Sequence, residues 1–144
     1  MVFYASVPEN NDIVQQAKAE FRNGIVVRRE NLDDYAVEAD CMLIGPGMMR
    51  GEKERINTTQ HLSLAEITAI EDQGEQSYWF TKYLLETYPQ KKWVIDAGAL
   101  QMMDPEWLRP LSRVIITPHP KEFERLFVMS PTRENVVAMA NELS

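Results

Sequence analysis

One histidine of the chain lies where a histidine side chain can do chemistry. The apolar run Val114–Ile116 is followed by Thr117 and then by His119 between two prolines, Pro118 and Pro120. Proline fixes the backbone φ angle and carries no N–H, so the imidazole is predicted to be held in one place and to offer a directed hydrogen bond there. The residues alone also allow a structured turn with a surface histidine.

The neighbouring sequence predicts where this histidine lies in the fold. The β-branched run Val114–Ile116 is typical of a short strand buried on both faces, and Phe123, Leu126 and Phe127 recur at helical spacing just after the turn. His119 is therefore expected at the carboxyl end of a strand. In open α/β sheets, ligands bind at that edge.

Two further predicted strands end in residues that suit a ligand. The run Asp40–Ile44 leads into Gly45-Pro46-Gly47, and its glycines permit close approach of a ligand to the backbone, although a plain tight turn is the alternative. The strand Lys92–Asp96 ends on a carboxylate. Asp96 suits a ligand hydroxyl or a hydrated cation, or equally the cap of the next turn.

The remaining chain alternates between strand and helix patterns. This alternation predicts an α/β fold with three layers, α/β/α, around one mostly parallel sheet of about five strands with helices on both faces. Beyond the segments already named, we expect strands at Val2–Val7 and Ile25–Val27; a helix with apolar positions from Ile13 to Phe21, capped by Asn11 or Asp12 and ended by Asn23-Gly24; and helices at Leu32–Ala39, Leu62–Ile70, Glu75–Tyr88, Pro105–Leu108 and Val136–Leu143.

Composition narrows the classes of function. The net charge is −7 and basic residues do not cluster, which argues against a nucleic-acid or anionic-membrane surface. No apolar run approaches the length of a membrane span. The single cysteine, Cys41, excludes an internal disulfide, and its apolar neighbours predict a buried thiol in a protein of the reducing cytoplasm. His61 has no partner at metal-ligand spacing and is expected at the surface.

The three strand ends, in this order, resemble those of the ribokinase-like NAD(P)H-hydrate dehydratase family. Members of that family carry G-P-G-L-G, D-A-D-A-L and T-P-H-P-G-E, and this chain has Gly45–Met49, Asp96–Leu100 and Thr117–Glu122 at the matching places. Val2–Glu9 resembles the second-strand region of the family. We therefore expect residues 1–144 to form a single partial ribokinase-like domain, its central portion, incomplete at both ends.

The resemblance implies an enzyme that uses ATP or ADP, with Mg²⁺, to dehydrate hydrated NADH and NADPH. By matched position, Gly47 would lie against the hydrated dinucleotide and His119 would contact it, while Asp96 matches the first acid of D-A-D and is taken as a further substrate-binding residue. Glu122 matches an acid that helps to hold the magnesium ion through water. The implied partners are the hydrated dinucleotide and an adenine nucleotide, and we expect a homo-oligomer.

Departures from the family pattern limit what is carried over. Gly98 replaces the second acid of D-A-D, Met49 replaces the second loop glycine, and Lys121 replaces the glycine before Glu122. The G-T-G-D segment, which supplies the anion hole and the aspartate base of the family, does not occur in these 144 residues, and neither does the Lys-Gly nucleotide loop. We therefore name no catalytic residue and expect a fragment that is inactive by itself.

Two other functions stay open at this stage. Another ribokinase-like kinase, for a vitamin precursor or a sugar, would share the strand-end motifs, although the histidine between Pro118 and Pro120 favours the dehydratase over kinases that have asparagine there. A non-catalytic remnant that binds a nucleotide or a partner chain would account for the missing aspartate.

Overall fold

The computed structural model describes residues 1–17, 23–53, 56–57 and 59–143 of the chain. The chain divides into two compact units, Met1–Asp40 and Cys41–Ser144. In the described residues all strand pairs are parallel and helices follow the strands along the chain, which confirms the predicted α/β class. The prediction that the 144 residues form one partial domain stays a prediction.

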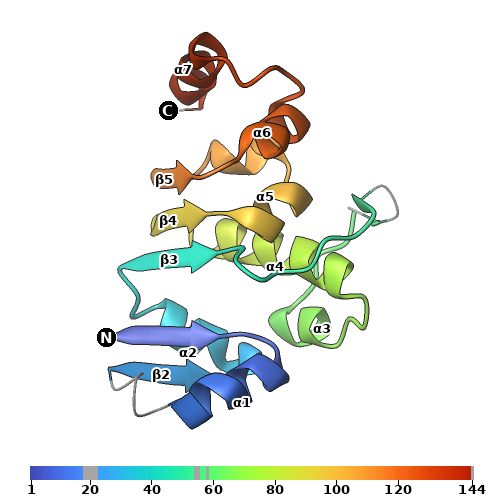
Figure 1. The fold of residues 1–144 in the computed structure, drawn as a ribbon. Coiled ribbons are helices and arrows are strands. Elements are labelled where there is room, and N and C mark those ends of the chain that lie inside the picture. Colours follow the sequence, from blue (N-terminus) through green and yellow to red (C-terminus); the bar gives the residue numbers. More distant parts are fainter. Residues whose placement is uncertain (18–22, 54–55, 58, 144) are drawn as a thin grey trace. The chain divides into compact units, whose positions relative to one another are not determined.

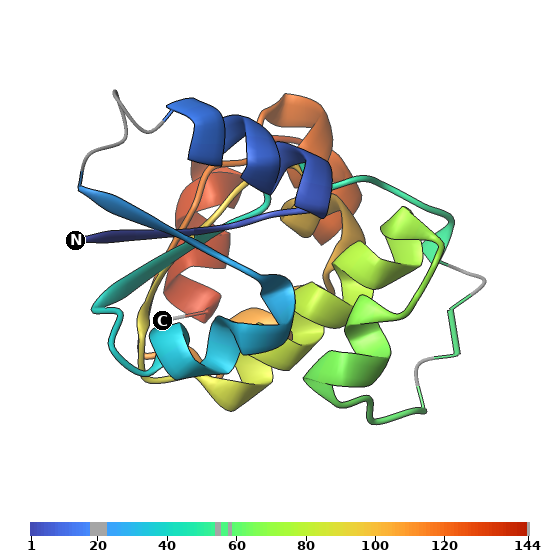
Figure 2. The ribbon, with the colours of Figure 1, turned by 90° about the horizontal axis from the view of Figure 1, so that it is seen from below.

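The first unit is a two-stranded sheet with helices on both faces. Its elements are β1 (Val2–Ala5), α1 (Pro8–Gln16), β2 (Gly24–Val27), the 3₁₀ turn η2 (Arg29–Asn31) and α2 (Leu32–Ala36). Figure 2 shows α1 and α2 on opposite sides of the two strands. The rings of Phe3 on β1 and Tyr35 on α2 have centroids 5.1 Å apart.

Asn11 corrects the predicted start of the first helix. The helix begins at Pro8, because proline suits the first helical position, where the N–H has no partner in the helix. Neither Asn11 nor Asp12 is the cap. Asn11 is instead buried, and its side chain accepts a hydrogen bond from the Ser6 N–H and donates one to the Val27 carbonyl. The predicted end of this helix, Phe21 included, lies outside the described residues.

The second unit contains a three-stranded parallel sheet in the order β3–β4–β5. These strands are Cys41–Ile44, Lys92–Ile95 and Arg113–Ile116, and their last residues, Ile44, Ile95 and Ile116, are partners in register. Figure 1 shows the three arrowheads pointing the same way. The loops that follow the strands therefore begin at one edge of the sheet.

The remaining elements of the second unit are helical. They are α3 (Leu64–Thr68), α4 (Gln73–Thr87), α5 (Ala97–Met102), the 3₁₀ turn η4 (Pro105–Leu108), α6 (Pro120–Phe127) and α7 (Arg133–Glu142). All of them except α5, which was not predicted, were expected close to these bounds. In the part of the chain that the structure describes, no helix has the length and apolar character needed to cross a membrane.

The predictions of one five-stranded sheet and of a fully buried fifth strand are wrong. The described strands pair as two separate sheets, of two and three strands. In the larger sheet, Leu43, Val94 and Ile115 form one cross-strand row, and Leu43 and Ile115 are 64% and 62% exposed. Cys41 is exposed as well, so its predicted burial is also wrong. Side chains alternate between the two faces of a strand, and an apolar run does not reveal which face is covered.

The core of the second unit lies on the other face of its sheet. Trp93 and Ile95 point to this face and are fully buried, together with Tyr78 and Leu85 of α4. Asp72 caps α4 by accepting a hydrogen bond from the Glu75 N–H. Burial of apolar residues from both α4 and β4 stabilises the sheet from which these loops begin.

Tyr78 makes the stability of this core depend on alkaline pH. Burial, with smaller contributions from the charges of Asp104 and Glu86, raises the pKa of Tyr78 to about 12. The unfolded chain ionises tyrosine near pH 10, so the folded state holds this proton more tightly and loses stability as the pH rises from about 10 to about 12. Urea unfolding across this range should show a smaller decline for Tyr78→Phe than for the wild type. Equal declines would contradict the assignment.

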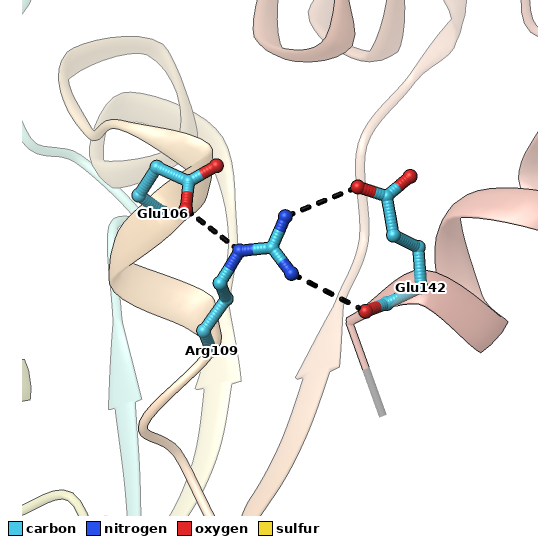
Figure 3. A network of polar contacts seen from close by, with 3 residues as sticks. All are labelled: Glu106, Arg109 and Glu142. Atoms are coloured by element: carbon cyan, nitrogen blue, oxygen red, sulfur yellow. Dashed lines mark hydrogen bonds and ion pairs between the residues drawn. The ribbon is translucent and has the colours of Figure 1, made fainter.

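The terminal helix α7 is attached to the unit by polar contacts. None of its residues is buried. Arg109, just after η4, donates from Nε to Glu106 at 2.6 Å and from Nη2 to the Glu142 carboxylate at 3.0 Å (Figure 3). The hydrogen bonds that Arg109 donates to these two carboxylates raise the pKa of its guanidinium group. Exposed ion pairs contribute little free energy, so α7 is held less firmly than the helices that contribute to the core.

Candidate ligand-binding edge

The carboxyl ends of β3, β4 and β5 bring together the three motifs singled out in the sequence. Gly45, Asp96 and Thr117 are the first residues after the register partners Ile44, Ile95 and Ile116. Gly47 and His119 follow two residues later in their loops. The structure therefore places Gly47, Asp96 and His119 at one sheet edge, as predicted, with Asp96 directly after the central strand.

The first two loops pack backbone against backbone. Gly45 has φ +117°, and a Cβ atom there would overlap the carbonyl oxygen of Asp96. The Asp96 N–H donates to the Ile44 carbonyl at 3.0 Å, and the Gly98 N–H donates to the Gly45 carbonyl at 3.2 Å. Because glycine has no Cβ and accepts positive φ, Gly45 permits this close approach.

The same packing explains the glycine that replaces the second acid of D-A-D. A Cβ atom on Gly98 would overlap the carbonyl of Met48, which belongs to the β3 loop. An aspartate at this position has no room while the β3 loop follows its present path. The path of the β3 loop beside Gly98 therefore explains why glycine stands where the family has an aspartate.

Gly47 has different surroundings from Gly45. It is exposed with φ +76°, and a Cβ atom there would meet nothing within 4 Å. The positive φ favours glycine, while no chain atom occupies the space beside it. This geometry leaves the Gly47 backbone open to a ligand, and its contact with substrate stays a prediction.

Asp96 is tied to the next strand end by a side-chain hydrogen bond. Its Oδ1 accepts from the Thr117 hydroxyl at 2.7 Å. The alternative role of Asp96 as a side-chain cap is not seen, because its carboxylate accepts no hydrogen bond from the N–H groups of α5. The following residue, Ala97, has φ +42°, a left-handed conformation that costs a non-glycine residue about 1–2 kcal/mol. The turn after β4 is thus held in a strained path.

Glu122 organises the loop that carries His119. Its side chain is 7% exposed, and its Oε2 accepts a hydrogen bond from the His119 N–H at 3.0 Å. Its Oε1 lies 3.2 Å from His119 Nε2 and accepts from Gln101 Nε2 at 2.7 Å. The His119 side chain is 57% exposed. A buried carboxylate therefore holds an accessible imidazole at the start of α6.

The side chains at this edge do not form a magnesium site by themselves. Both oxygens of Glu122 already accept hydrogen bonds from chain N–H groups. Among the residues that the structure describes, no group of three or more His, Cys, Asp and Glu side chains could hold a metal ion. No chemical step is therefore derived through magnesium, and the metal role of Glu122 stays a prediction.

Sequence reasoning did not foresee the contacts by which four residues build this edge: Gly45, Gly98, Thr117 and Gln101. Gly45 and Thr117 lie inside the recognised motifs and could have been found from their position at a strand end. Gly98 was noticed as a departure without a reason. Gln101 gave no signal, because its role depends on where α5 packs against α6.

These features define a parallel α/β protein whose candidate ligand site is the carboxyl edge of its sheet, built from a Gly-Pro-Gly turn, an aspartate and a proline-flanked histidine. Comparison with known protein families identifies the family within this class. The NAD(P)H-hydrate dehydratase family matches residues 4–144, and the chain belongs to this family. No curated protein and no solved structure matches the chain.

Proposed function

We propose that the chain serves nicotinamide-nucleotide repair in the cytoplasm. The reaction is the ATP- or ADP-dependent dehydration of hydrated NADH and NADPH, and magnesium accompanies the adenine nucleotide. The observation that carries this proposal is the family match over residues 4–144, together with the placement of the family's strand-end motifs at one edge. Within this function, the residues of this chain bind the hydrated dinucleotide, and the chain forms a homo-oligomer.

Each proposed contact has a simple chemical basis. The open backbone at Gly47 lets a flat or extended ligand approach without meeting a side chain. The Asp96 carboxylate accepts hydrogen bonds from hydroxyl groups, which both the hydrate and the riboses carry. His119 adds one directed hydrogen bond from a loop that prolines and Glu122 hold in place.

His119→Ala tests this assignment through binding. We expect the affinity for hydrated NADPH to fall by about 1–3 kcal/mol, or about 5- to 150-fold, because a polar ligand group loses its partner. Affinity for ATP or ADP should barely change. Isothermal titration calorimetry with each ligand separately measures both effects.

His61 provides the matched control, since it is the other histidine of the chain and is exposed. His61→Ala should leave both affinities unchanged. Equal weakening of nucleotide and dinucleotide binding by His119→Ala would mean that the imidazole only shapes the loop, and the substrate contact would then be dropped.

The 144-residue chain should bind the hydrated dinucleotide without converting it to NADH or NADPH. It lacks the G-T-G-D segment that carries the base and the anion hole of the family, and losing one oxyanion-stabilising donor alone costs about 2.7–4 kcal/mol. Incubation with hydrated NADH, ATP or ADP and Mg²⁺ should therefore give no return of the near-ultraviolet absorbance of NADH above the rate without protein. Nucleotide-dependent return would show that these residues supply a base of their own.

A further inference from the structure

One face of the three-stranded sheet in the second unit is exposed. Two cross-strand rows form this face, which we call the open sheet face: Cys41, Lys92 and Arg113 in the first row, and Leu43, Val94 and Ile115 in the second. All six residues are exposed except Val94, which is half-buried on the central strand. A sheet normally buries its apolar faces against another layer. The apolar second row therefore marks a surface that a further element can cover.

The open sheet face has a defined width and charge. Neighbouring strands lie about 4.8 Å apart, so the apolar row spans about 10 Å across its three strands, which is close to the diameter of an α-helix. The face contains two cations, Lys92 and Arg113, and no acidic residue. In the described part of the chain, neither cation forms an ion pair. This face suits a helix that presents apolar side chains next to a carboxylate.

Helix α7 presents such a surface to solvent. Val136 and Val137 are 45% and 51% exposed, and Ala140, also exposed, lies on the same side of the helix because residues three and four apart are neighbours there. Glu134 lies one turn before Val137 and is exposed as well. The helix contains one cation and two carboxylates, a net charge of −1. The ion pair of α7 with Arg109 is made by Glu142 and does not involve the valines.

We propose that α7 of one copy of the chain lies on the open sheet face of a second copy. Val136 and Val137 then cover the apolar row, and Glu134 lies beside Lys92 and Arg113 of the other copy. Every copy carries both surfaces, so association needs no other partner. In a chain with a net charge of −7, a face with two cations and no acid is also where repulsion between copies is least. That a homo-oligomer forms rests on the proposed function, whereas the surfaces assigned to it come from the exposed residues.

Sedimentation velocity over a series of concentrations tests the association. The wild-type chain should associate. Ile115→Glu and Val137→Lys should each raise the dissociation constant about tenfold or more, because each variant brings an unpaired charge into an apolar contact. Both positions are exposed in a single copy, so the variants should fold.

Ile13→Glu is the matched control for these two variants. Ile13 lies on α1 and, like Leu43, is 64% exposed, so its replacement changes exposed apolar surface outside the proposed contact. The dissociation constant should stay unchanged. A wild-type chain that remains monomeric, or equal weakening by all three variants, would overturn the proposal.

An exchange of charges tests whether α7 and the open sheet face meet. Arg113→Glu and Glu134→Lys should each raise the dissociation constant by about fivefold or more, because like charges then face each other. The double variant restores opposite charges and should recover most of the lost affinity. A double variant that associates no better than the weaker single variant would contradict the contact.

The single cysteine of the chain identifies what covers the face. Cys41 lies on the open sheet face, so a short bismaleimide can link it to the cysteine introduced by Val137→Cys. The expected product is a covalent dimer joined between α7 and β3, which peptide mass spectrometry identifies. A link within one copy would mean that α7 covers its own sheet, and dimers joined only between two Cys41 residues would mean that two sheet faces meet. Either result would overturn the proposal.

Titration of the same preparations with hydrated NADPH separates this inference from the repair function. A monomeric chain that binds hydrated NADPH would overturn the proposed interface and leave the repair function standing. A chain that associates through α7 and the open sheet face without binding hydrated NADPH would uphold the interface and contradict the repair function.

Discussion

Replacing Gly45 by alanine is expected to remove at least about 3 kcal/mol of folding free energy, a large share of the total for a chain of this size. A Cβ atom would overlap the Asp96 carbonyl, which belongs to the backbone and cannot rotate away. The φ of +117° adds strain for any residue with a side chain. Urea unfolding followed by circular dichroism measures the loss.

Gly47→Ala is the matched control for this prediction. The two glycines flank Pro46 and both have positive φ, but a Cβ atom on Gly47 meets nothing within 4 Å. Only the conformational strain then remains, about 1–2 kcal/mol. Equal losses for Gly45→Ala and Gly47→Ala would contradict the close packing of the β3 loop on the β4 loop.

The second large effect is expected at Gly98, where an aspartate would restore the family's D-A-D pattern. We expect Gly98→Asp to lower the stability by about 1–3 kcal/mol or more, because the side chain would overlap the Met48 carbonyl and bring a charge into a buried position. It should not tighten binding of hydrated NADPH. Thermal unfolding and calorimetric titration of the same preparation measure both quantities.

Ala97→Gly is the control for Gly98→Asp, because it changes the adjacent residue in the opposite sense. Ala97 has φ +42°, so glycine relieves strain there and the stability should stay equal or rise. A Gly98→Asp variant that keeps its stability and binds the dinucleotide more tightly would mean that the β3 loop follows another path in solution.

Much of the secondary structure could be predicted because its signals are local. The run of apolar residues around Trp93 and the aromatic stripe of α4 predict a strand and a helix without any knowledge of their partners. The start of α1 was predicted wrongly from local signals. Asn11 has the residue type of a helix cap, but the helix begins at Pro8 and the buried Asn11 side chain donates a hydrogen bond to β2. Pairing into two sheets was not predicted, because it depends on contacts between distant segments.

The candidate site was predictable to the extent that it follows from strand direction. Parallel strands place their carboxyl ends at one edge, so Gly47, Asp96 and His119 could be grouped from the sequence alone. The connections between them could not be predicted. The hydrogen bond from Gln101 to Glu122 and the overlap that Gly98 avoids depend on distances set by helix and loop packing, and neither leaves a pattern in the sequence.

The most direct test of the central claim is an amide NMR titration of the ¹⁵N-labelled chain with hydrated NADPH, since the claim concerns where the dinucleotide binds. The account predicts shift changes concentrated at Gly47, at Asp96–Gly98 and at Thr117 and His119, with little change in β1 and β2. Absence of shift changes at saturating ligand would contradict the account. So would changes confined to the first unit, for example at the hollow lined by Met1, Asn23, Gly24 and Ile25.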